Sequence, residues 1–201
     1  LNLGDTEKFL CLQALERYQL IEEPLSKQKA FDLAKSKFES ALNIYQQLIV
    51  IENRLNVKLF AQLNQLDLLL KSNEFNFEGG KSHTQNLGSL TKELLTVNFK
   101  HLPTIESVNA QVKFSEILIE IYSNEKFNHV LEKSVSVASL FDLASALEKN
   151  KIIDTRGKSL IKGTLGKIYY QLGKTEDSLL NLEKALILAQ SVQGWDLTYK
   201  W

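Results

Sequence analysis

The sequence predicts an all-α fold, a right-handed superhelical array of antiparallel helix pairs with about eight helices. Apolar residues recur every three or four positions through most of the 201-residue chain, which is the spacing of a buried helix face. Only two prolines and nine glycines interrupt these runs, so long helices are favoured. We therefore expect a single helical-repeat domain over 1–201. Its pairs should lie at approximately 5–52, 54–101, 103–150 and 154–192, and a further helix should start at 194–201.

The first pair combines a helix over 6–22 with a longer one over 26–51. Pro24 is expected to end the first helix, because proline cannot continue the hydrogen-bond pattern of a helix interior. Apolar residues at helical spacing give each helix one buried side. They are Phe9, Leu12, Leu15 and Tyr18 in the first helix, and Phe31, Ala34, Phe38, Ala41, Leu42, Tyr45 and Leu48 in the second.

The second pair starts with a predicted helix over 56–72, whose apolar residues at helical spacing are Val57, Phe60, Leu63, Leu66, Leu69 and Leu70. The next segment, 73–89, contains three glycines and three asparagines, and we expect it to be a loop and a flexible insertion. Helical spacing resumes over 90–101. The pair therefore carries a long connection between its two helices.

The third pair begins at Pro103, which fits the first turn of a helix because its missing N–H would have no partner there. A helix is predicted over 105–122 and another over 127–149. Val130 and Val135 lower the helix propensity of the latter segment, so packing must stabilise it.

The last pair is the best defined. Leu165 and Ile168 share one face of its first helix, and Gly166 leaves room for a bulky side chain of a neighbouring helix. Gly173 is expected to supply a left-handed turn, after which Thr175 should cap the second helix. That second helix is apolar on two sides, which predicts neighbours on both. We therefore expect a further repeat after it.

The chain contains no methionine and stops at Trp201 inside a helix-like segment, so we expect it to be a piece of a longer protein. Its 24 basic and 24 acidic residues balance, which argues against a nucleic-acid binder, because such proteins neutralise phosphates with excess positive charge. No apolar run is long enough for a membrane span, and no membrane partner is expected in this fragment. A single cysteine leaves the compartment open.

The pattern Leu165-Gly166-x-x-Tyr169-x-x-x-Gly173, followed by Ala185, resembles the tetratricopeptide repeat. Ser178 stands where that family usually has alanine and Lys162 where it often has tryptophan. Further signals are Ala34-x-x-x-Phe38-x-x-Ala41, the run 54–70 and the helix entered at Leu102-Pro103. Long, degenerate helix pairs that end in a sharp one resemble the repeat region of cyanobacterial proteins with a C-terminal CHAT domain, which is caspase-like. The resemblance implies that any peptidase domain would lie downstream of this chain.

No motif of a catalytic, cofactor or metal site is complete. Gly79-Gly80-Lys81-Ser82 lacks the earlier glycine of a phosphate-binding loop, since Phe75 stands there, and is expected to be a flexible loop. The three histidines are too far apart to form a helical zinc-binding pair. Cys11 is expected to be a small buried side chain, and Glu22/Glu23 and Glu176/Asp177 to be solvated. We expect no cofactor, no metal and no enzyme in this fragment.

The first helix of each pair in such an array lines a concave groove that binds a peptide or a partner helix. The register of the tetratricopeptide pattern predicts the partner-binding residues Asp67, Lys71, Ser115, Tyr122, Gly163, Lys167, Tyr170 and Gln171. The expected function is a protein-interaction scaffold with a protein or peptide partner. The alternative is an intramolecular regulatory region that controls a downstream CHAT, or caspase-like, domain of the same chain.

Overall fold

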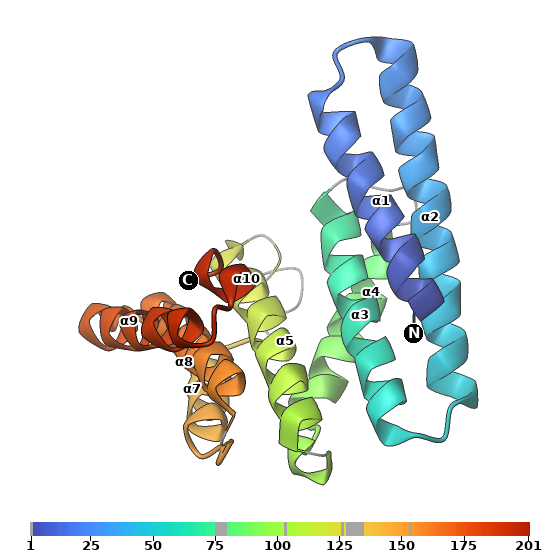
Figure 1. Cartoon of the computed structure of the whole chain (residues 1–201). Helices are drawn as coiled ribbons and strands as arrows, with labels where there is room; N and C mark the ends of the chain where they lie inside the picture. The colour runs from blue at the N-terminus through green and yellow to red at the C-terminus, as the bar shows by residue number, and fades with distance from the viewer. Residues whose placement is uncertain (1, 75–79, 103, 126, 128–134, 153) are drawn as a thin grey trace. The chain divides into compact units, whose positions relative to one another are not determined.

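In a computed structural model, the described residues are 2–74, 80–102, 104–125, 127, 135–152 and 154–201. They form nine α-helices and one 3-10 turn, and no strand occurs among them (Figure 1). The predicted all-α class is confirmed, whereas the right-handed superhelical array stays a prediction. The chain divides into two compact units, unit 1 at Leu1–Leu90 and unit 2 at Thr91–Trp201. No helix in the described ranges is long and apolar enough to cross a membrane.

Unit 1 contains α1 (Asn2–Leu20), α2 (Pro24–Ile51), α3 (Leu55–Glu74) and the first part of α4 (Gly80–Leu95). Helices α1 and α2 form an antiparallel hairpin, and α3 packs on α2 (Figure 1). The predicted apolar stripes build this core. Its buried residues include Cys11, Leu15, Ala34, Phe38, Ala41, Tyr45, Leu63, Leu66, Leu69 and Leu70. Phe9, in contrast, is exposed.

One carboxylate joins the three long helices of unit 1. The fully buried Tyr45 on α2 donates its hydroxyl to Oδ1 of Asp5 on α1 at 2.8 Å. Asn64 on α3 donates its side-chain N–H to the same oxygen at 2.6 Å. Burial, together with the negative charge of Asp5, raises the pKa of Tyr45, so the phenol stays protonated and remains a donor. Two buried donors therefore depend on one acceptor at the start of α1.

Two sequence predictions for unit 1 are wrong. Pro24 does not end α1; it is the first residue of α2, where its missing N–H costs nothing, and Glu23 caps that helix by accepting from the Ser26 N–H. The segment 73–89 is not a loop throughout, because α4 already begins at Gly80. Leu87 and Leu90 are buried and give α4 an apolar side, so packing outweighs the glycines. Residues 75–79 lie outside the described residues.

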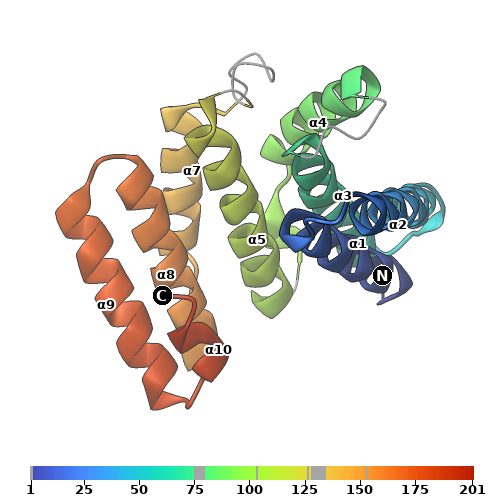
Figure 2. The same ribbon diagram turned by 90° about the horizontal axis from the view of Figure 1, so that it is seen from above.

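The described residues of unit 2 form the end of α4, the 3-10 turn η1 (Phe99–His101) and five α-helices. These helices are α5 (Thr104–Ser123), α7 (Val137–Glu148), α8 (Thr155–Gln171), α9 (Thr175–Ser191) and α10 (Trp195–Thr198). Helix α8 is central to the unit, since α5, α7 and α9 all pack on it (Figure 2). The predicted helix start at 194–201 is present as the single turn of α10.

The single helix predicted over 127–149 is wrong. Ser136 is extended rather than helical, and it caps α7 through a reciprocal pair of hydrogen bonds with Ser139. The helix therefore begins anew at Val137. Residues 128–134 lie outside the described residues. The two serines form a start signal that the apolar spacing alone does not reveal.

The turn between α8 and α9 has the predicted left-handed glycine. Gly173 has a φ of 71°, and its N–H donates to the carbonyl of Tyr170, while the Lys174 N–H donates to the carbonyl of Tyr169. These two bonds form a Schellman motif, which satisfies the last carbonyls of α8. The predicted capping by Thr175 is wrong. Lys174 occupies the cap position, with no side-chain hydrogen bond, and Thr175 is already the first residue of α9.

Gly166 brings α8 and α9 into close contact, as its position predicts. A Cβ at this residue would lie 2.6 Å from Cγ of Leu182 and 3.1 Å from the carbonyl oxygen of Ser178. Lys162, which replaces the tryptophan of the tetratricopeptide pattern, donates to Asn181 on α9 at 3.3 Å. On α9 itself, only small or short residues such as Ser178, Ala185 and Ala189 are fully buried. The pair is thus held by close backbone approach.

We predict that Tyr45→Phe lowers the free energy of unfolding by about 1 kcal/mol, because Asp5 loses one of its two donors. Urea denaturation followed by circular dichroism measures this. The matched control is Tyr199→Phe, since Tyr199 is 89% exposed and should change the stability by less than about 0.5 kcal/mol. Equal effects of the two variants would contradict a structural role for the Asp5 junction.

We predict that Gly166→Val destabilises the protein by about 2 kcal/mol, because the new side chain overlaps Leu182. Lys158→Val places the same residue at an exposed position of α8 and should cost less than about 1 kcal/mol. Adding Leu182→Ala to Gly166→Val should recover part of the loss, which thermal unfolding of the four forms of a double-mutant cycle measures. If the effects of Gly166→Val and Leu182→Ala on stability are strictly additive, the contact between the two positions is refuted.

Candidate functional site

Five residues of α8 form a line along one side of the helix: Arg156, Ser159, Gly163, Lys167 and Tyr170. Their separations of three and four positions place them one above another on a single face. We call this line the α8 stripe. Its middle is narrow, since Ser159 and Gly163 are small and buried, and its far end is open, since Tyr170 is 67% exposed. The stripe carries two cations and no carboxylate.

The chain itself covers most of the stripe. After α9 the backbone turns at Gly194, and the segment Trp195–Trp201, here called the returning segment, runs back along α8 (Figure 2). Arg156 donates both of its terminal guanidinium nitrogens to the carboxylate of Asp196. Leu197, the next residue, is 3% exposed. The returning segment thus begins with one ion pair and one buried aliphatic side chain.

Trp201 sits on the middle of the stripe. Its indole N–H donates to Oγ of Ser159 at 3.2 Å, and that hydroxyl in turn donates to the carbonyl of Ala185 at 2.8 Å. The ring lies against the backbone of Gly163, where an added Cβ would be only 2.3 Å from the ring atoms Cδ2 and Cε2. Any larger residue at 163 would displace the ring. The site is therefore shaped for a flat aromatic group with one N–H donor.

Charged groups close the site around the indole. Nζ of Lys167 lies 4.7 Å from the ring centroid, and Nζ of Lys200 lies 5.1 Å from it. Both ammonium groups approach Glu116 on α5, at 4.0 Å and 2.6 Å from its Oε1. This oxygen accepts no hydrogen bond of good geometry, so the contact is an ion pair. Burial lowers the pKa of Lys167, the charge of Lys200 lowers it further, and Glu116 opposes both effects.

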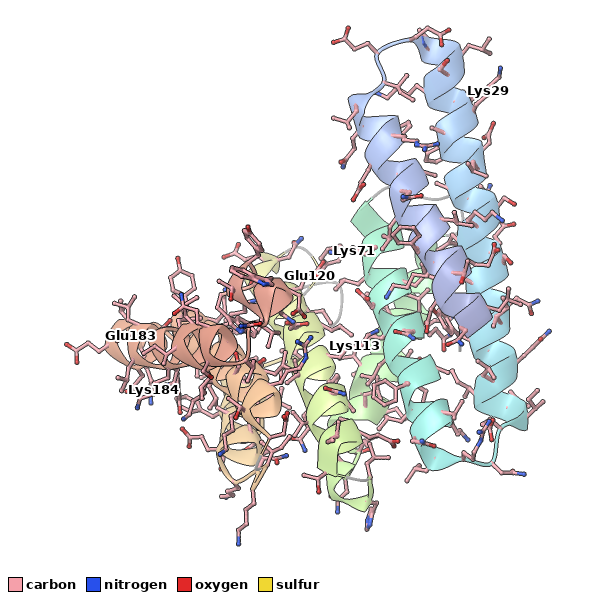
Figure 3. The ribbon with its side chains drawn as sticks, viewed as in Figure 1. Lys29, Lys71, Lys113, Glu120, Glu183 and Lys184 are labelled. Carbon is pink, nitrogen blue, oxygen red and sulfur yellow. The ribbon has the colours of Figure 1, made fainter. Side chains whose placement is uncertain are left out.

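Two of the eight predicted partner-binding residues, Asp67 and Lys71, belong to unit 1. The carboxylate of Asp67 forms a half-buried ion pair with Lys8 of α1, so it helps to hold α1 against α3. Lys71 is half-buried in the last turn of α3 (Figure 3). The Asp67 carboxylate is therefore engaged within unit 1.

The other six predicted residues lie in unit 2. Ser115 is completely buried and donates to the carbonyl of Gln111, so it has no surface for a partner. Gly163 is covered by Trp201. Tyr122 and Gln171 are half-buried, Lys167 has a side chain that is 36% exposed, and Tyr170 is the most exposed of the six. The structure brings Gly163, Lys167 and Tyr170 together on the α8 stripe.

Sequence reasoning missed four residues of this site, namely Arg156, Ser159, Glu116 and Trp201. Glu116 is adjacent to the predicted Ser115, and one position along a helix turns a side chain by about 100°, so Glu116 faces the lysines of the site while Ser115 is buried. Ser159 and Gly163, two small residues four positions apart, are a usable signal for close approach of another group to a helix. Trp201 could not be found from local spacing, because its contacts lie far back along the chain.

The remaining described residues show no other convergent site. No group of three potential metal ligands occurs among them. Cys11 is 1% exposed, and burial raises the pKa of its thiol to about 11, so it is not an activated nucleophile. A hollow of about 590 Å³ lies within unit 2, lined by residues of η1, α5 and α7 such as Ser107, Gln111 and Lys149. Oε1 of Gln111 has no hydrogen-bond partner there.

A comparison of the chain with protein-family models, curated protein sequences and solved structures finds no significant match. The site is therefore interpreted from its own chemistry.

We predict that Gly163→Ala expels the indole of Trp201 from the stripe, because the new Cβ would overlap the ring. The chain has two tryptophans, so Trp195→Phe leaves Trp201 as the single fluorescent reporter. In that background Gly163→Ala should shift the emission to longer wavelength and raise the acrylamide quenching constant about twofold. The control is Lys184→Ala at an exposed position of α9, which should change neither quantity (Figure 3). An unchanged spectrum in the Gly163→Ala protein would refute the packing.

Proposed function

We propose that this protein is an interaction scaffold whose α8 stripe binds an extended peptide or a helix of a partner protein. One observation carries the proposal: the stripe already holds a peptide segment of its own chain through an indole and an ion pair. Aromatic anchors, apolar pockets and arginine pairs are the contacts that dominate peptide recognition.

The open end of the stripe supports the same function. Tyr170 exposes two thirds of its surface, next to a glutamine amide at position 171 that can both donate and accept hydrogen bonds. Tyrosine is common at interfaces because it offers a large rigid ring with a polar end and has few rotatable bonds. A partner that follows the stripe beyond the returning segment would meet these two side chains first. The tetratricopeptide resemblance favours the same face.

The regulatory alternative, in which the repeats hold a downstream CHAT domain inactive, rests on the resemblance. The α8 stripe would then bind a surface of that domain, so both proposals use the same residues. A protein that extends beyond Trp201 and lacks a caspase-like domain would remove the alternative and leave the scaffold proposal in place.

We predict that Tyr170→Ala weakens peptide binding about tenfold or more, because it removes an exposed aromatic anchor. Peptides are selected from a phage-displayed random library on the whole 201-residue protein, and their affinities are measured by fluorescence anisotropy. Lys29→Ala on α2 and Lys184→Ala on α9 serve as controls, since both lysines are exposed and neither belongs to the stripe (Figure 3). The proposal fails if no peptide is selected, or if Tyr170→Ala binds the selected peptides as tightly as the wild type.

A further inference from the structure

We propose that the α8 stripe is a recognition site for a partner segment that presents a tryptophan, and that the returning segment occupies this site as a built-in competitor. The inference rests on the proposed function and names the chemistry of its ligand. The preferred partner segment carries an acidic residue, an aliphatic residue directly after it and an indole five positions after the acid. That is the pattern Asp196-Leu197-x-x-x-Trp201 of the returning segment.

The indole site selects its ligand at three points. Gly163 admits only a flat ring, because an added Cβ would already lie 2.3 Å from the ring that is there. Oγ of Ser159 accepts the indole N–H and donates onward to the carbonyl of Ala185, so its orientation is fixed. The ammonium group of Lys167 covers the ring at 4.7 Å and favours an electron-rich aromatic system. Phenylalanine would fill the space but leave the acceptor on Ser159 without its donor.

The charges of the stripe select a second group of the ligand. Arg156, three residues before Ser159, binds a carboxylate through two hydrogen bonds. This bidentate geometry fits a planar acid better than a single oxygen acceptor. The stripe itself carries no acidic side chain, and the carboxylate of Glu116 beside it faces Lys167 and Lys200. The ligand is therefore an acidic, tryptophan-containing peptide.

Leu197 of the returning segment is buried, but the other groups that hold the segment are accessible to solvent. Trp201 is only partly buried, its two lysine neighbours are about one third exposed, and the side chains of the Arg156–Asp196 pair are 51% and 60% exposed. Exposed ion pairs of this kind contribute little to stability. A tethered segment nevertheless competes well, because its effective concentration near the site is in the millimolar range. A free ligand must therefore displace the returning segment before it binds.

The test uses the peptide Trp-Asp-Leu-Thr-Tyr-Lys-Trp, labelled with fluorescein and capped as an amide, and the whole chain as wild type and as the double variant Asp196→Ala/Trp201→Ala. Fluorescence anisotropy should show that the peptide binds the double variant about tenfold or more tightly than the wild type, because the competitor has lost two anchors. The same peptide with alanine in place of its last tryptophan should bind about tenfold more weakly. Circular dichroism shows whether the double variant keeps its helix content.

Gly163→Ala in the double variant is the matched control for the site, because it fills the indole pocket and should abolish peptide binding, whereas Lys184→Ala should not. Equal affinity of the peptide for wild type and double variant, or no binding to a folded double variant, overturns the inference. If library-selected peptides still bind through Tyr170 in that case, the proposed scaffold function stands while the tryptophan site is refuted. Loss of both kinds of binding refutes both.

Discussion

Unit 2 depends on the small volume of helix α8. Three of its glycines each admit a side chain from elsewhere: a Cβ at Gly157 would meet Ile152, one at Gly163 would meet Trp201, and one at Gly166 would meet Leu182. Each glycine in a helix interior costs about 1 kcal/mol relative to alanine. The cost is offset because neighbouring groups pack directly on the backbone of α8 from different sides. A larger residue at any of these positions would separate α8 from the group that packs there.

The helices of unit 1 are held together by large side chains and by shared hydrogen bonds. Its helices have large apolar stripes, with Phe38 and Tyr45 almost fully buried, and one acceptor on Asp5 receives hydrogen bonds from two other helices. Salt bridges from α1 to α2 and α3, formed by Glu7 with Lys37 and by Lys8 with Asp67, lie at the edge of this core.

Local patterns predicted the parts of the fold that local physics controls. Apolar spacing located most of the long helices, Gly173 located the left-handed turn, and Gly166 located the close contact with α9. The predictions fail at two places. Helix α4 forms although its first residues include glycine, and Ser136 starts a new helix inside a segment with helical apolar spacing. On α5, the predicted residue Ser115 is buried, whereas its neighbour Glu116 contacts a lysine of the site. The repeats are too irregular for the position to be transferred from one helix to another. Trp201 depends on tertiary structure alone, which no periodic pattern encodes.

The same small residues that make α8 a good packing surface also make it a selective one. A helix face with long side chains can adjust its rotamers to many ligands, whereas backbone at Gly163 and a hydroxyl fixed by Ala185 cannot move away. The shape of the indole site is therefore set by the fold of α8 and α9. Lys167 of α8 places its ammonium group 4.7 Å from the ring centroid, whereas the second ammonium group at the ring comes from Lys200 of the returning segment itself. A rigid site of this shape selects for the ring that fits it. The exposed ion pair beside it adds little affinity, so under the proposal the returning segment can be displaced.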